Sequence, residues 1–166
     1  MLAAEIYSGS FFDVSPRSRF ITLVTAVEAL LEPAERSEPL QLLIEQMEAL
    51  ARSAAGIDDL TKGSIISNLQ WLKAESIGQA GKALSARLLP DKKYDHRAAS
   101  AFFNYCYNIC SKLVHRGRID PSINPLLLAN SMEAFVADLL IASLKQGCKQ
   151  PKLNLQISRD RKYRPH

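Results

Sequence analysis

Apolar residues recur every three or four positions along most of this chain, which is the spacing of one face of an α-helix. Capping and stop signals divide the pattern into separate segments. Ser15 and Pro16 supply an N-cap and a first helical residue, and Pro33 ends the apolar run that follows. The pair Asn124 and Pro125 opens the last segment in the same way. The predicted helices cover about residues 15–31, 37–54, 62–73, 76–90, 96–116 and 124–146.

Helices of these lengths, joined by short connections, predict an all-α protein built as a helical bundle. Segments 62–73 and 76–90 are either two helices or one bent helix, so the bundle has five to six helices. Segment 37–54 places Leu43, Ile44 and Met47 on one face, which we expect to face the core. Trp71 and Glu28 are expected to pack inside the bundle as well.

The end of the chain departs from the helical pattern. Leu153, Leu155 and Ile157 alternate with polar residues, which is strand periodicity over residues 152–158. This short strand would pair with its copy in a dimer, join the sheet of another protein, or lie extended on the bundle. We therefore divide the chain into a helical domain, residues 1–147, and an extended basic tail, residues 148–166.

Charge separates the same two regions. The chain carries +4 overall, but from Lys145 onward it has seven basic residues and one acidic residue, so residues 1–144 are net negative. A basic tail favours a polyanionic partner through release of counterions, and it can equally serve as a solubilising end. With 47% apolar and 23% charged residues, the helical domain has the composition of a globular core.

Several classes of protein are disfavoured. No apolar run approaches the roughly 18–20 residues of a membrane span, and the N-terminus lacks a secretory signal. Three cysteines without CxxC spacing indicate a reducing compartment, so we expect a cytoplasmic protein without membrane contact. Cys106 and Cys110 lack the ligand spacing of a zinc site. The glycines do not form a nucleotide loop, so neither a metal nor a cofactor is expected.

Candidate chemistry is concentrated in helix 96–116. Beside its apolar seam runs a polar line of Asn104, Asn108, Ser111 and His115, spaced by four, three and four residues. The place of His115 in the last helical turn favours the charged imidazolium. Together with three neighbouring cations it would suit a phosphate better than a metal. The same line also fits a structural or surface role. The cations are Lys112, Arg116 and Arg118.

Three separated segments resemble the Apea-like HEPN domains of the HEPN ribonuclease superfamily. Residues 19–30 read RFITLVTAVEAL, like the first long helix of that family, and residues 72–77 read LKAESI, like its L-K-x-E-S-I segment. Residues 102–117, with SKLVHRG at their end, resemble its closing motif, Y-x-x-R-S-x-x-V-H-x-G. The resemblance covers about residues 5–145.

The resemblance implies a bundle that forms a homodimer through its motif helices, here the 96–116 helix. Active members are metal-independent endoribonucleases, in which a histidine assists proton transfer at the ribose 2′-hydroxyl and an arginine stabilises phosphate charge. His115 matches the histidine and Ser111 the polar residue after the arginine, but Cys110 stands at the arginine position. A neutral thiol cannot replace a guanidinium that holds phosphate through two bonds, so the nuclease motif is impaired.

Two functions follow as hypotheses. The first is an RNA-directed dimer with a weakened or inactive nuclease site, which the family places in defence or toxin–antitoxin systems. Its RNA-binding residues would be Asn108, Lys112, Arg116 and Arg118. The second is a non-catalytic module for dimerisation or for docking a partner protein, with no role in RNA binding.

Overall fold

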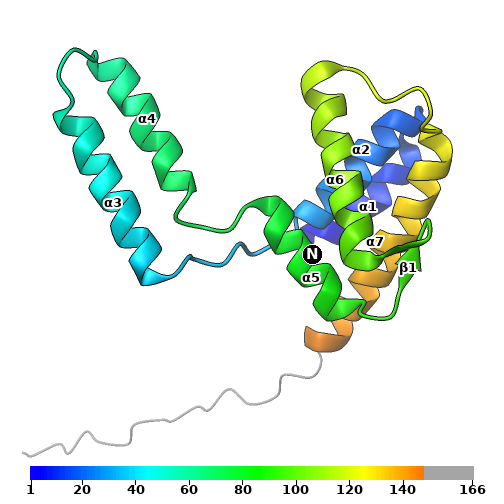
Figure 1. The fold of residues 1–166 in the computed structure, drawn as a ribbon. Helices are drawn as coiled ribbons and strands as arrows, with labels where there is room; N and C mark the ends of the chain where they lie inside the picture. The colour runs from blue at the N-terminus through cyan, green and yellow to red at the C-terminus, as the bar shows by residue number, and fades with distance from the viewer. Residues whose placement is uncertain (148–166) are drawn as a thin grey trace, which may run out of the picture.

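The computed structural model describes residues 1–147, which form seven α-helices and one two-stranded hairpin, so the predicted all-α class is confirmed (Figure 1). The helices are α1 (Leu2–Gly9), α2 (Pro16–Glu28), α3 (Glu38–Ser53), α4 (Asp59–Trp71), α5 (Ile77–Leu88), α6 (Ala99–Arg116) and α7 (Pro125–Gly147). A 3₁₀ turn, η1 (Ser10–Phe12), follows α1. The sequence pattern missed α1, because eight residues without a capping side chain carry few signals of a helix. The predicted strand at residues 152–158 lies outside the described residues.

Five of these helices build one core. Helix α2 packs along α7, α5 packs along α6, and α1 lies against α2. Aromatic rings fill the centre, where Phe135 meets Phe102 at 5.5 Å and Tyr94 at 5.1 Å between ring centroids. The largest side chains buried in this cluster are Phe20, Phe102, Phe103, Phe135, Leu23, Met132 and Leu139.

Helix α7 is long and apolar enough, by length and composition, to cross a membrane. One face of this helix packs in the core. Met132, Phe135, Val136 and Leu139 are buried in the bundle, and α7 makes more contact with α2 than any other pair of helices makes. Its acidic residues are paired with other elements: Glu133 with Arg19, and Asp138 with the Tyr94 hydroxyl at 2.6 Å.

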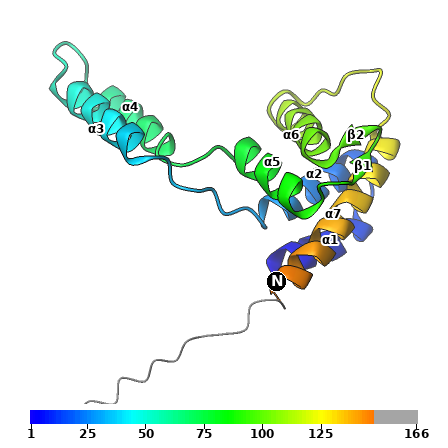
Figure 2. The same cartoon turned by 60° about the horizontal axis from the view of Figure 1, so that its bottom comes forward.

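The other two helices form a hairpin that stands apart from this core. Figures 1 and 2 show α3 and α4 side by side and separated from the bundle, joined to it by two extended segments. Ile44 is the only buried residue of either helix, and Trp71 is 80% exposed. The expectations that the 37–54 face and Trp71 pack into the bundle are therefore wrong. Helical periodicity predicts that a helix has an apolar face, but not which element covers that face.

The two extended segments are held together at the base of the hairpin. The Arg36 amide donates to the Lys73 carbonyl and the Glu75 amide to the Ala34 carbonyl, both at 2.9 Å. Ser76 then caps α5 in a capping box with Gln79, as its sequence predicts. Residues 62–73 and 76–90 are thus parts of two separate helices.

A small hairpin precedes α6. Strands β1 (Lys93–Tyr94) and β2 (Arg97–Ala98) pair antiparallel, and the turn between them places Asp95 and His96 at φ of 45° and 60°. Two consecutive residues with positive φ make a tight turn that matches the twist of paired strands. Helix α6 therefore begins at Ala99 rather than at the predicted residue 96.

Candidate nucleic-acid interface at the end of α6

Helix α6 has the two faces that its sequence predicts. Its apolar seam is buried in full and comprises Ala99, Phe102, Phe103, Cys106, Ile109, Cys110 and Leu113. On the opposite side Asn104 is half-buried, while Asn108, Ser111, Lys112 and His115 are exposed. The amides, the hydroxyl and the imidazole are therefore accessible to a ligand and are not buried in the core.

The loop that follows α6 is fixed against the same face. Gly117 takes the left-handed conformation, with φ of 65°, and its amide donates to the Leu113 carbonyl, ending the helix. Asp120 accepts from the amide and hydroxyl of Ser122 at 2.9 and 2.7 Å, which forms a side-chain turn. Ile119 and Ile123 pack onto the core, so the chain between them is held at the surface of α6.

Two adjoining hollows lie between α6 and this loop. One, of about 430 Å³, includes Asn104, Tyr105, Asn108 and Lys112 in its lining. The other, of about 690 Å³, adds Arg116 and, from the first turn of α2, Arg17. Lys112, Arg118, Ile119 and Asp120 line both hollows. We call these two hollows together the α6 cleft.

Positive charge predominates in the α6 cleft. Lys112, Arg116, Arg118 and Arg17 reach it from three segments of the chain, against one carboxylate, Asp120. The pKa of Asp120 is lowered first by the backbone and side-chain hydrogen bonds from Ser122 and then by Lys112, so this carboxylate is ionised at neutral pH. Arg17 also stands in the first turn of α2, where the helix dipole adds positive potential.

An aromatic ring borders the smaller hollow of the cleft. Tyr105 lines the smaller hollow, and the Arg97 guanidinium lies over its ring, 4.1 Å from the centroid. Arg97 is in turn paired with Asp95. The stacked cation fixes the ring beside Asn104 and Asn108.

Comparisons with protein-family models, curated proteins and solved structures gave no match to this chain. The resemblance to HEPN domains therefore remains an inference from the quoted sequence segments.

The two motif positions lie in different environments. Cys110 belongs to the core and is 8% exposed, whereas His115 is exposed and lines neither hollow. Burial, followed by the nearby Glu28 carboxylate, raises the pKa of Cys110 to about 11, so the thiol is neutral at pH 7. Glu28, expected inside the bundle, is half-buried, and desolvation raises its pKa. Residue 110 thus offers neither charge nor access to a phosphate.

The structure brings together the four residues that the sequence suggested for RNA contact: Asn108, Lys112, Arg116 and Arg118. It does not bring Ser111 and His115 into the cleft that these four line. Sequence analysis missed Arg17 and Tyr105. The basic stretch Pro16–Arg19 gave a signal for Arg17, but only the packing of α2 near α6 shows that it reaches the same cleft.

Among residues 1–147, no three His, Cys, Asp or Glu side chains are grouped as potential metal ligands.

Proposed function

We propose that this protein is an HEPN-like, RNA-directed protein that binds single-stranded RNA in the α6 cleft, and that its nuclease site is impaired. The observation that supports binding most directly is the convergence of Arg17, Lys112, Arg116 and Arg118 on one hollow. Cations spread over a surface are ordinary solvated charges. Four cations around a hollow can contact successive phosphates of one strand.

The uncharged side chains of the smaller hollow favour RNA over a simple anion. Asn104 and Asn108 offer amide donors and acceptors, which suit base edges and ribose hydroxyls. Tyr105 offers the edge or remaining face of a ring for contact with a base. In single-stranded RNA, phosphates, hydroxyls and bases lie a few ångströms apart. The cleft residues of α6 are separated by similar distances along the helix.

The surroundings of Cys110 support loss of cleavage. Phosphoryl transfer needs a cation placed at the charge that develops on phosphate, and removing one such group commonly costs about 10²–10³ in rate. Residue 110 is a buried, neutral thiol. The cations of the cleft approach from other directions than the core side of α6.

The test is binding of a labelled single-stranded RNA of about 20 nucleotides, long enough for one site, measured by fluorescence anisotropy in EDTA between about 50 and 200 mM salt. The triple variant Lys112→Gln, Arg116→Gln, Arg118→Gln should bind more weakly. The slope of log affinity against log salt concentration should be shallower by about 2, because each lost phosphate contact reduces the slope by about 0.7.

The matched control removes three exposed cations elsewhere, as Lys82→Gln, Arg87→Gln, Lys93→Gln, with the same change in net charge. It should keep the slope of the parent. Equal losses in the two triple variants would show general attraction by charge and would refute the cleft. Cleavage of the RNA by the parent, lost in His115→Ala, would refute the impaired site while leaving binding in the cleft intact.

A further inference from the structure

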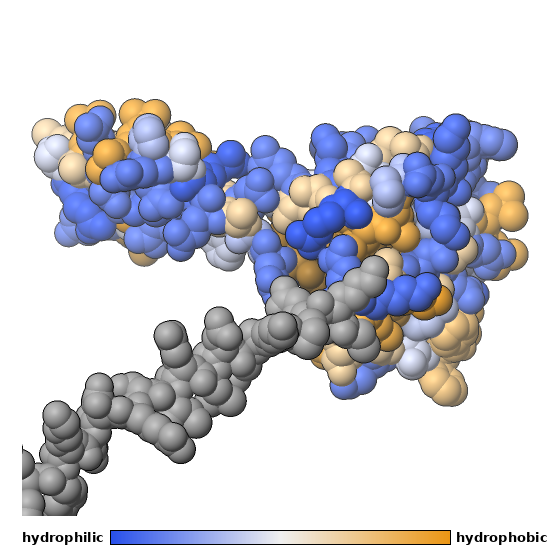
Figure 3. All heavy atoms as spheres, turned by 90° about the horizontal axis from the view of Figure 1, so that it is seen from below, coloured by the Kyte–Doolittle hydropathy of each residue, from blue (hydrophilic) through white to orange (hydrophobic). Residues whose placement is uncertain are grey.

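The α3–α4 hairpin exposes an apolar face that nothing in residues 1–147 covers. Leu43, Met47 and Leu50 follow one another at spacings of four and three along α3, and each is at least 44% exposed. Ile65 and Leu72, seven residues apart, form the matching stripe at α4. Because the two helices run antiparallel, both stripes border the same side of the hairpin. In Figure 3 hydrophobic residues, drawn in orange, gather along the upper edge of the hairpin at the left of the view.

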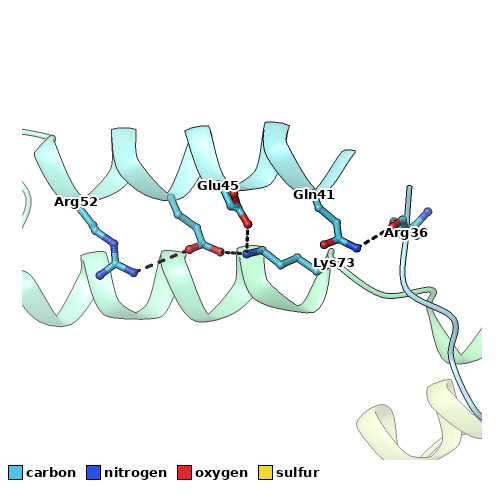
Figure 4. A network of polar contacts seen from close by, with 6 residues as sticks. Arg36, Gln41, Glu45, Arg52 and Lys73 are labelled. Carbon is cyan, nitrogen blue, oxygen red and sulfur yellow. Dashed lines mark hydrogen bonds and ion pairs between the residues drawn. The ribbon is translucent and has the colours of Figure 1, made fainter. Parts of the chain in front are cut away.

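The charged residues of α3 lie elsewhere. The four charges of α3 fall within an arc of about 80° on a helix of 3.6 residues per turn, away from its apolar stripe. They are Glu38, Glu45, Glu48 and Arg52. Figure 4 shows how these charges are used: the Lys73 ammonium lies 3.4 Å from Glu45 and 3.5 Å from Glu48. The apolar stripe of α3 thus carries no charge, and a network of ion pairs occupies a different side. In line with the α4 stripe stands one charge, Asp58, which caps α4 at the tip of the hairpin, seven residues before Ile65.

The contact between α3 and α4 is too small to support the hairpin alone. Ile44 is the one side chain that it buries completely, and two short helices without further packing are marginal in water. Burial of the exposed apolar face against a partner would supply the missing stabilisation of the hairpin. A half-exposed leucine leaves about 50 Å² of apolar surface in water. With Leu42 and Trp71 at its outer edges, the face therefore amounts to about 400 Å².

We infer that this face is an interface between two copies of the chain, in which two hairpins pack into a four-helix bundle. An area of about 400 Å² is close to the apolar share of the roughly 800 Å² that each partner buries in a stable complex. A two-fold interface brings a patch against its own copy, so any net charge on the patch would repel itself. Between Leu43 and Leu50, and between Ile65 and Leu72, the stripes carry no charge, and the one carboxylate in line with them, Asp58, lies at the tip of the hairpin. The middle of the face therefore satisfies that condition, and an apolar face with a carboxylate at its end disfavours a nucleic acid as the occupant.

A second copy of the chain also fits the requirement that the apolar face of the hairpin be buried for the hairpin to be stable. A segment that needs a partner for stability must meet it whenever the chain folds, and another copy of the same chain is present in equal amount. This pairing uses a different surface from the 96–116 helix. Val114 is the one large apolar residue exposed within α6, so that helix offers little apolar area to a partner. The inference does not depend on RNA binding, because the hairpin and the α6 cleft share no residue.

The experiment is the mass of the full chain by light scattering at micromolar concentration, for the parent and for variants at Met47, near the middle of the face. The parent should be a dimer of about 37 kDa, twice the 18.4 kDa of one chain. Met47→Glu and Met47→Lys should each be monomeric. An equimolar mixture of the two should form dimers again, because opposite charges then meet near the two-fold axis.

Recovery in the mixture separates a lost interface from a lost fold. The matched control is Leu126→Glu, which places the same charge at a leucine of α7 that is 50% exposed, and this variant should remain a dimer. A monomeric parent would overturn the inference. So would Met47 variants that remain dimeric, since the copies would then meet through another surface, such as α6. Loss of RNA binding in the cleft variants leaves this result unchanged.

Discussion

The bundle and the hairpin consist of similar amphipathic helices, yet they use their apolar residues in opposite ways. Helix α6 buries seven of its 18 residues, whereas α3 buries one of 16. In the bundle the apolar stripes of α2, α6 and α7 meet within the chain and form one buried cluster. In the hairpin the side chains of the α3 and α4 stripes are between 37% and 71% exposed. The difference shows that apolar periodicity predicts a helix face that must be buried. Either the same chain or a second molecule can bury that face.

The largest expected effect tests the packing of the bundle at one glycine. A Cβ at Gly81 would stand 2.0 Å from the Phe103 ring, which is itself fully buried and stacked on Tyr107 and Phe135. We expect Gly81→Ala to lower the free energy of unfolding by about 3 kcal/mol, because a packed ring must move. Chemical denaturation followed by far-ultraviolet circular dichroism measures the change.

The hairpin provides the matched control. A Cβ at Gly63, inside α4, would meet nothing within 4 Å, so Gly63→Ala should raise stability by up to about 1 kcal/mol through helix propensity. Similar destabilisation by both variants would show that the hairpin is as tightly packed as the bundle, and the comparison between the two regions would fail.

A second prediction concerns the one buried residue of the hairpin. Ile44→Ala should destabilise α3 and α4 by about 2 kcal/mol, at the low end for a buried isoleucine because the exposed surroundings can relax. Hydrogen exchange should speed up across α3 and α4 and remain unchanged in α6 and α7. Leu60→Ala, at a side chain of α4 that is 87% exposed and lies outside the apolar face, should change little. Faster exchange across the whole chain in Ile44→Ala would mean that hairpin and bundle unfold as one unit.

These contrasts mark how far the sequence predicts the structure. The helices from residue 15 onward, the Ser15 cap, the Ser76 capping box and the buried seam of α6 all follow from local spacing. Their signals lie within a few residues of one another. The projection of the hairpin and the exposure of Trp71 depend on which stripes meet in three dimensions, and no local pattern carries that information.

The candidate site divides in the same way. Asn108, Lys112 and Arg116 share one side of a helix, so their spacing predicts that they lie together. Arg17 joins them through the packing of elements about a hundred residues apart in the chain, which no local pattern carries. Tyr105 stands three residues before Asn108 and seven before Lys112 in α6, so helical spacing predicts its place beside them as well. The depth of Cys110 in the core is the decisive fact about the motif, and alignment to a motif assigns a position without its burial.

The smallest expected effect separates the two regions by pH. Burial raises the pKa of Tyr94, Cys106 and Cys110 in the bundle, whereas in the hairpin the side-chain hydrogen bond from Thr61 lowers the pKa of Asp58. A raised pKa in the folded state means that the folded protein holds its proton more tightly than the unfolded chain. Its stabilising contribution is present below the unfolded value, near 9 for a thiol, and is lost as pH rises toward the folded value. The bundle should therefore weaken in alkali. Acid does not separate the two regions, because the pKa of Asp120 in the loop after α6 is lowered by hydrogen bonds from Ser122, as that of Asp58 is by Thr61.

For Cys110 alone, with a folded pKa of about 11, the loss between pH 8 and pH 10 should be about 1 kcal/mol. Denaturation in the presence of reductant at both pH values measures it. Cys110→Ala should lose about that much less stability across the interval than the parent, whatever its stability at pH 8. Because the test compares differences between two pH values, the packing lost with the thiol cancels. An identical alkaline loss in parent and variant would mean that the thiol is as open to water as in an unfolded chain. Residue 110 would then face the solvent side of α6, and the case for an impaired phosphate site would lose its main support.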